Sequence, residues 1–308
     1  MSKLLTVFGA TGNQGGSVIK AVLADPVLSK TFKIRGITRD TSKPSAQALA
    51  AKGVEVVAAD MSSKESIAPA VDGAHTVFLS TNFWESMSAD VEVGQGKAVA
   101  DASKAAGVKH LIFSSLIHVK EASKGRLTHV THFDGKADIE KYIRDSGIPS
   151  TFVLPGFFMS NLFSSFTKND DGSFTYALPI DGDKGQLPIF DPVADTGKFV
   201  KAAIKQFPST DGKQIHAATE YITPKRLMSE FSEVIGKPAN FVQVPGDTYK
   251  SFLPPAIAEE LYENMLLLED PGYYAGADLK PSLALLDEND KPTTWKGFVE
   301  ANKDKWLK

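Results

Sequence analysis

Residues 4–16 read LLTVFGATGNQGG, an apolar run that leads into glycines at positions 9, 12 and 15. The run predicts a buried strand, and the apolar spacing over residues 14–24 predicts a helix after it. Glycine lets the backbone turn tightly and approach a pyrophosphate closely, because no Cβ stands in the way. The helix N-terminus then points its free N–H groups at the phosphates. We therefore predict a dinucleotide-binding turn that comprises Gly9, Thr11, Gly12, Asn13, Gln14 and Gly15.

Strand and helix signals alternate from this turn to about residue 155. Further strands are predicted at residues 32–39, 54–60, 76–81, 110–116 and 151–154. Their apolar rather than half-polar pattern indicates a parallel sheet that is covered on both faces. We predict an α/β fold in which residues 1–155 form a doubly wound, Rossmann-type sheet.

The alternation of strand and helix signals ends after Pro155, where turn-rich segments begin. Here the sequence predicts a strand over residues 214–222 and helices over 224–235 and 256–268. We assign residues 156–308 to a smaller α+β C-terminal domain, partly interleaved with the first.

Composition excludes several classes of protein. The 308 residues include 34 Lys and Arg against 37 Asp and Glu, a formal net charge of −3, so we expect no direct contact with nucleic acid. The absence of cysteine excludes disulfides and fits a reducing, cytoplasmic or nuclear setting. No apolar stretch approaches the ~20 residues of a membrane helix, and the N-terminal run is too short for a signal peptide. We therefore expect no membrane association.

The end of the second predicted strand indicates which dinucleotide binds. Arg39 lies there, where a basic residue accommodates the 2′-phosphate of NADP, and Lys43 follows four residues later. The alternative for Arg39 is a solvated surface charge. Asp40 is adjacent, so we expect NADP(H) as the cofactor and NAD as a weaker ligand. Asp60 ends the third strand, either near the adenine or as a helix cap.

The glycine turn and four later segments resemble the NmrA-like family of atypical short-chain dehydrogenases. They read TVFGATGNQGGSV (6–18), ITRD (37–40), STNF (80–83), HFDGK (132–136) and LPGFFMSN (154–161). The resemblance runs from residue 4 to about residue 270. It implies NADP(H) in a cleft, with the phosphate loop at Gly9 through Gln14, the 2′-phosphate at Arg39 and Lys43, and the adenine side at Asp60. It also implies nicotinamide-side contacts at Thr81, Asn82, Lys136 and the segment from Phe158 to Asn161. Phe83 follows Asn82 at the end of the fourth strand, where the chain is expected to line the cofactor.

One departure from the dehydrogenase pattern bears on activity. Active short-chain dehydrogenases carry Tyr-x-x-x-Lys, which here reads His132-x-x-x-Lys136. A typical short-chain dehydrogenase is therefore not expected, and Lys136 and His132 are the candidate catalytic residues. His132 is either a proton donor or a hydrogen-bonded polar residue without chemistry. No carboxylate near His129 and His132 completes a metal set in the sequence, so we expect no metal.

Two functions remain open. The first is an NADP(H)-binding regulator or redox sensor that acts through a protein partner, such as a transcription factor, without efficient turnover. The alternative is an NADPH-dependent reductase of a small carbonyl or enol substrate, similar to isoflavone reductase-like enzymes. The aromatic run over 157–166 either walls a substrate pocket or packs the domain junction. The oligomeric state, a homodimer included, stays open.

Overall fold

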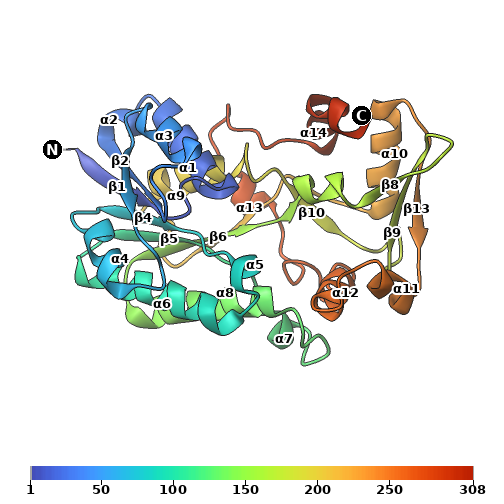
Figure 1. Ribbon diagram of the computed structural model, residues 1–308, viewed down its shortest axis with the longest axis horizontal. Coiled ribbons are helices and arrows are strands. Elements are labelled where there is room, and N and C mark those ends of the chain that lie inside the picture. The colour runs from blue at the N-terminus through green and yellow to red at the C-terminus, as the bar shows by residue number, and fades with distance from the viewer. Residues whose placement is uncertain (1, 308) are drawn as a thin grey trace.

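The computed structural model describes residues 2–307 and shows two halves side by side (Figure 1). The left half holds a parallel sheet of seven strands in the order β11-β6-β5-β4-β1-β2-β3. Its strands are β1 (Lys3–Val7), β2 (Phe32–Thr38), β3 (Glu55–Ala58), β4 (Thr76–Leu79), β5 (His110–Ser114), β6 (Ser150–Pro155) and β11 (Gln214–Ala217). This order confirms the predicted doubly wound fold, and the direction of winding reverses between β1 and β4.

Helices cover both faces of this sheet (Figure 1). One face carries α1 (Asn13–Ala24), α2 (Leu28–Thr31), α3 (Pro44–Ala50) and α9 (Thr196–Gln206), and the other carries α4 (Lys64–Val71), α6 (Ala89–Ala105) and α8 (Thr131–Ser146). Neighbouring strand residues face opposite sides and are apolar on both. Phe78 packs in the core on the α1 side, while Val77 and Leu79 pack in the core on the α6 side. Burial on both faces accounts for the continuous apolar strands in the sequence.

The right half contains two small sheets and most of the later helices (Figure 1). One sheet has the order β12-β10-β7 and the other β13-β9-β8. The strands are β7 (Phe157–Phe158), β8 (Phe166–Lys168), β9 (Phe174–Leu178), β10 (Leu187–Phe190), β12 (Glu220–Ile222) and β13 (Ala239–Gln243). Its helices are η1 (Met159–Phe163), α10 (Pro224–Ile235), α11 (Gly246–Ser251), α12 (Ala258–Leu266), α14 (Trp295–Ala301) and α15 (Lys303–Leu307). Helix α13 (Lys280–Leu283) instead packs against β11 of the first sheet. Met1 and Lys308, the outermost residues of the two predicted domains, lie outside the described part of the chain.

The chain returns to the first sheet after β10. Helix α9 packs against α1, where the Gly197 N–H donates to Ser17 Oγ at 2.9 Å. Strand β11 then pairs in parallel with β6. The single strand predicted over residues 214–222 is therefore two strands in two sheets, separated at Ala218 and Thr219. The segment carries the chain from one half to the other.

Other parts of the structure were not predicted from the sequence, among them the eleven-residue helix α9 and the strands β8, β9 and β10. The four-residue helices α2, α5 (Phe83–Ser86), α7 (Val119–Ala122) and α13 were not predicted either, because so few residues show no periodicity. The N-cap position of α8 belongs to Val130, and the hydroxyl of the next residue, Thr131, donates to Glu260 at 3.1 Å. Within residues 2–307 no helix is both long and apolar enough to cross a bilayer.

Candidate functional site

The glycine turn after β1 is shaped by two of its three glycines. Gly9 has φ +69°, a left-handed conformation that glycine adopts without strain. A Cβ on Gly15 would lie 2.2 Å from the carbonyl oxygen of Gly9, so the helix meets the turn too closely for any side chain. Gly12 precedes α1, and no side chain caps that terminus. The uncapped N–H groups at the start of α1 are thus available to an anion.

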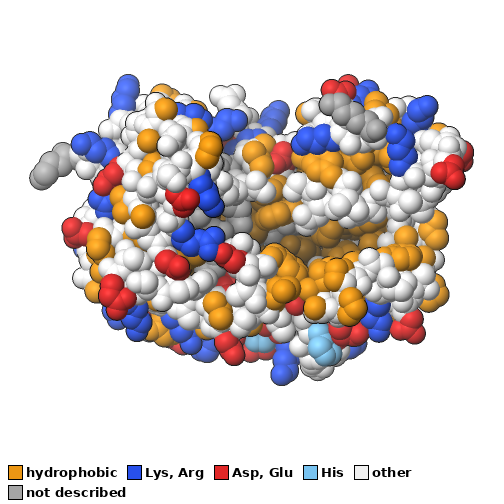
Figure 2. Space-filling view, viewed as in Figure 1, with side chains coloured by type: hydrophobic (Ala, Val, Ile, Leu, Met, Phe, Trp, Pro, Cys, Tyr) orange, Lys and Arg blue, Asp and Glu red, His pale blue; other side chains and the backbone are white. Residues whose placement is uncertain are grey.

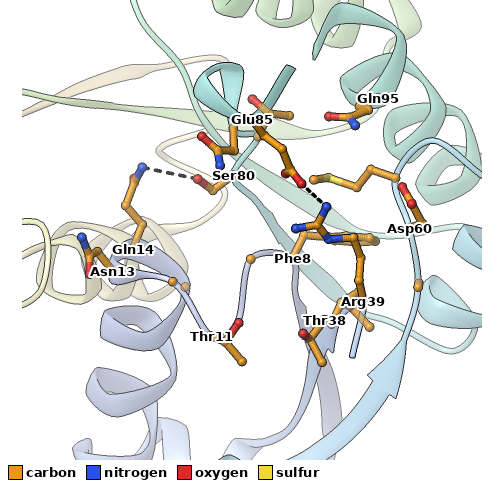
Figure 3. A pocket seen from close by; sticks show the side chains of 18 of the residues that line it. Phe8, Thr11, Asn13, Gln14, Thr38, Arg39, Asp60, Ser80, Glu85 and Gln95 are labelled. Carbon is orange, nitrogen blue, oxygen red and sulfur yellow. Dashed lines mark hydrogen bonds and ion pairs between the residues drawn. The ribbon is translucent and has the colours of Figure 1, made fainter. Parts of the chain in front are cut away.

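A cavity of about 420 Å³ lies beside this turn, at the carboxyl ends of β1 to β4 (Figure 3). The structure brings twelve of the predicted cofactor-binding residues to its wall: Gly9, Thr11, Gly12, Asn13, Gln14, Gly15, Arg39, Lys43, Asp60, Thr81, Asn82 and Phe158. Met61, Ser80, Glu85 and Gln95 also line it and were not predicted. A glycine cradle, an uncapped helix terminus and two cations suit a dinucleotide phosphate chain, so the cleft fits NADP(H).

Arg39 does not stand alone at the outer end of this cleft. Its guanidinium forms an ion pair with Glu85 of α5 (Figure 3), and both side chains are exposed, by 61% and 44%. Asp40 is not paired with Arg39, and its carboxylate accepts hydrogen bonds from the backbone N–H and the hydroxyl of Ser42. These hydrogen bonds lower the pKa of Asp40. The predicted phosphate-binding arginine is therefore paired with an acid that the sequence did not reveal.

Asp60 lines the same cleft, and its carboxylate accepts from the Ser62 N–H at 2.8 Å. The helix that follows, α4, is capped by Ser63 rather than by Asp60. Of the two roles considered for Asp60, capping of this helix is therefore wrong.

A second cavity of about 230 Å³ adjoins the first, since Gln14, Thr81, Asn82 and Phe158 line both. Its walls are largely apolar: Phe83, Trp84, Leu116, Phe133, Phe157, Leu261 and Tyr273. His132, Lys136 and Asn161 also line it. Figure 2 shows apolar side chains gathered in the hollow between the two halves. We call this second cavity the apolar pocket.

The aromatic run over residues 157–166 divides between the two roles considered for it. Phe157 and Phe158 line the apolar pocket. Phe163 and Phe166 instead pack in the core of the right half. The ring centroid of Phe163 lies 4.6 Å from that of Trp306, and the ring centroid of Phe166 lies 4.9 Å from that of Phe231. The division follows the chain, which enters the right half along β7 and η1.

Lys136 is held by a buried carboxylate. Its ammonium forms an ion pair with Glu92 of α6 and donates to Thr81 Oγ1 at 2.9 Å, while the Thr81 hydroxyl donates to Glu92 at 2.7 Å. Glu92 is fully buried, and its second oxygen, Oε2, has no partner among the described residues. Burial lowers the pKa of Lys136, against the opposing effect of Glu92. Glu92 was missed because an acidic residue on a predicted helix is usually solvated.

His132 is hydrogen-bonded to a glutamate on one side of its ring and packs against two aromatic side chains. Its Nδ1 lies 2.6 Å from Oε1 of Glu260, and its backbone N–H donates to the same oxygen at 2.8 Å. The ring centroid lies 5.0 Å from that of Trp84 and 4.9 Å from that of Phe133. Nε2 makes no hydrogen bond to any residue in the described range. Burial alone would raise the pKa of Glu260, but the hydrogen bonds from His132 outweigh it and lower that pKa.

A second histidine repeats this arrangement one turn earlier. Glu263 accepts from the backbone N–H of His129 at 2.6 Å and lies 2.7 Å from its Nδ1. The hydrogen bond raises the pKa of His129. Glu259 lies beside them, so that His129, Glu259 and Glu263 each place one atom that could bind a metal ion within 4.8 Å of the others. The sequence showed no carboxylate near His129, because α12 supplies these residues from the other half of the molecule. Together with Glu260, they fasten α12 to the start of α8.

Comparison with known proteins gives a consistent family. The model of the NmrA-like family matches residues 1–299. The NmrA-like family domain-containing oxidoreductase ptmS of Penicillium ochrochloron is 34% identical over 268 residues, which cover 81% of this chain and 78% of that protein. The fold matches crystal structures of NmrA, a negative transcriptional regulator, in complex with NAD (TM-score 0.83) and with NADP (0.82). Each is 22% identical and covers 100% of this chain and 99% of its own. The NADPH-dependent quinone oxidoreductase QOR2 of Escherichia coli, complexed with NADPH, has a TM-score of 0.77 and 24% identity, and covers 96% and 99%.

Proposed function

Because the chain belongs to the NmrA-like family, we propose that it is an NADP(H)-dependent reductase of a small, largely apolar carbonyl or enol compound. The observation that carries the proposal is the apolar pocket, which opens from the dinucleotide cleft and contains His132 and Lys136. Binding of a cofactor alone requires no such pocket beside it. The relative ptmS is named an oxidoreductase, which agrees with this function.

The cofactor part of the proposal rests on the cleft itself. The turn between β1 and α1 receives the pyrophosphate, and Arg39 and Lys43 lie where the adenosine 2′-phosphate distinguishes NADP from NAD. The four residues shared by both cavities, Gln14, Thr81, Asn82 and Phe158, then border the nicotinamide. NAD, which lacks the phosphate, is a weaker ligand in this proposal.

His132 takes the place of the missing tyrosine in the proposed chemistry. Bound NADPH supplies a hydride. His132 donates a proton from Nε2 to the substrate oxygen, while Glu260 accepts from Nδ1 and fixes the orientation of the ring. The aromatic walls orient the substrate and exclude water. Lys136 is already engaged by Glu92 and Thr81, so we assign it to fixing this wall and to contacting the cofactor, not to proton transfer.

A second candidate is the NADP(H)-binding regulator or redox sensor, located in the cytoplasm or nucleus. It is favoured by the absence of tyrosine at position 132 and by the engagement of Lys136 with Glu92. In that case the protein binds NADP without efficient turnover and acts through a protein partner, such as a transcription factor.

One experiment separates the two candidates. NADPH absorbance is followed with a panel of quinones, aldehydes and ketones, beside calorimetric titration of the same protein with NADP and NAD. Decay that requires both the protein and a member of the panel supports the reductase. Tight NADP binding without decay for any compound supports the regulator, and failure to bind either dinucleotide contradicts both.

A further inference from the structure

We infer that Glu85 moderates the preference for NADP over NAD, because it competes with the 2′-phosphate of NADP for the guanidinium of Arg39. The inference rests on the proposed function in one respect, that the cleft binds NADP(H). It adds a specificity-determining residue outside the glycine turn and the β2 end. Glu85 lies on α5, a helix of four residues that follows β4.

The geometry singles out Glu85 among the acidic residues that line the cleft. The Arg39 guanidinium is paired with Glu85, and Figure 3 shows the two side chains meeting across the cleft. Asp40 is turned to Ser42, and Asp60 accepts from the Ser62 backbone. Neither Asp40 nor Asp60 is paired with Arg39 in the structure. The Arg39–Glu85 pair is well exposed and therefore opens at little cost, which lets a bound phosphate replace the carboxylate.

The two dinucleotides make opposite demands on this pair. The 2′-phosphate of NADP carries roughly two negative charges, so it attracts Arg39 and repels Glu85. The 2′-hydroxyl of NAD instead donates a hydrogen bond, and an acidic side chain is the usual acceptor for it in this kind of fold. Glu85 can accept that bond while it stays paired with Arg39. The pair thus presents one group suited to each cofactor, and Glu85 moderates the preference for NADP.

The local packing permits a clean substitution. Phe83 anchors α5, because it is only 3% exposed, whereas the Glu85 side chain is 44% exposed. Glu85→Gln keeps the size of the side chain and removes its charge. Glu65→Gln is the matched control, since Glu65 is an exposed carboxylate in the first turn of α4 that does not line the cleft.

The test is calorimetric titration of the intact protein with NADP and with NAD at low salt. Loss of one exposed ion pair corresponds to a change in affinity of up to about fivefold, so Glu85→Gln should bind NADP roughly two- to fivefold more tightly. NAD binding should stay the same or weaken, and Glu65→Gln should match the parent. Equal effects on both dinucleotides, or no effect, would overturn the role of Glu85.

A second background separates competition from simple repulsion. In the Arg39→Ala variant no guanidinium remains to be released, so adding Glu85→Gln should give little further gain in NADP affinity. A gain as large as in the parent would indicate direct repulsion between Glu85 and the phosphate and would overturn competition for Arg39. If the parent binds neither dinucleotide, the cofactor assignment fails together with this inference. If the parent binds NADP but the NADP/NAD ratio does not respond to Glu85→Gln, the inference alone fails.

Discussion

Gly15→Ala should disrupt the nucleotide turn, and the structure allows the effect to be estimated. The new Cβ would lie 2.2 Å from the carbonyl oxygen and 2.6 Å from the carbonyl carbon of Gly9. Both atoms belong to the backbone, so no side chain can swing aside, and the turn must move by about 1 Å. Overpacking of this kind costs about 1–3 kcal/mol, from which up to ~1 kcal/mol is recovered because alanine favours helix over glycine. We expect a loss of about 1–2 kcal/mol, or a fall in Tm of about 2–6 °C.

Gly16→Ala is the control, one residue further along the same helix. Its Cβ would lie 3.6 Å from the nearest atom, the Ala10 carbonyl oxygen, which is an ordinary contact. We expect an unchanged or slightly raised Tm, because only the gain in helix propensity remains. Thermal unfolding measures stability without ligand, and calorimetric titration measures NADP affinity, which should fall at least about tenfold for Gly15→Ala alone. If the two variants behave alike in both assays, the close approach at Gly15 does not shape the site.

Three further outcomes are expected. His132→Gln should lower kcat about a hundredfold and leave NADP affinity nearly unchanged, because a general acid contributes roughly 10²–10⁴-fold to a rate; full activity on a panel substrate would exclude His132 as the proton donor. Lys136→Met leaves the carboxylate of Glu92 buried and without its cation, so urea unfolding should show that the free energy of unfolding falls by about 3–5 kcal/mol. Adding Glu92→Gln should restore much of this loss, and a double variant as unstable as Lys136→Met alone would contradict the account. Burial lowers the pKa of His110 from 6.5 to about 4, so between these pH values the unfolded chain binds a proton that the folded protein excludes. The free energy of unfolding should therefore fall by ~3 kcal/mol as the pH drops from 6.5 to 4, and His110→Phe should remove that part of the pH dependence.

The sequence predicted those parts of the fold in which several independent signals, such as apolar periodicity and glycine spacing, indicate the same element. The strand, glycine turn and helix over residues 4–24 carry apolar periodicity and a glycine spacing that agree, and this whole segment was predicted. The break at Ala218 and Thr219 has no glycine or proline to mark it, so β11 and β12 were merged. Tertiary pairing, rather than local propensity, decides where such strands end.

The candidate site shows the same division. Arg39 and Lys136 were predicted because each lies at a fixed offset from a recognisable motif. Glu85, Glu92 and Glu260 were missed because each acts by touching a residue distant in the chain, 46, 44 and 128 positions away. A glutamate on a helix is by default a solvated residue, and nothing in its neighbours reports a buried partner.

The late return of the chain to the first sheet has a consequence for how the protein is made. Strand β11 pairs with the edge of β6, and α9 packs against α1. Residues 196–217 therefore complete the sheet and the helices on one of its faces, which begin with β1 at residue 3. At translation speeds of about 5–20 residues per second, β6 waits several seconds on the ribosome before its neighbour emerges. During that interval its edge presents unpaired backbone groups, which are a template for association with other chains. A fragment that stops after β6 keeps this edge open permanently, so the nucleotide-binding half should be expressed only together with the segment that closes it.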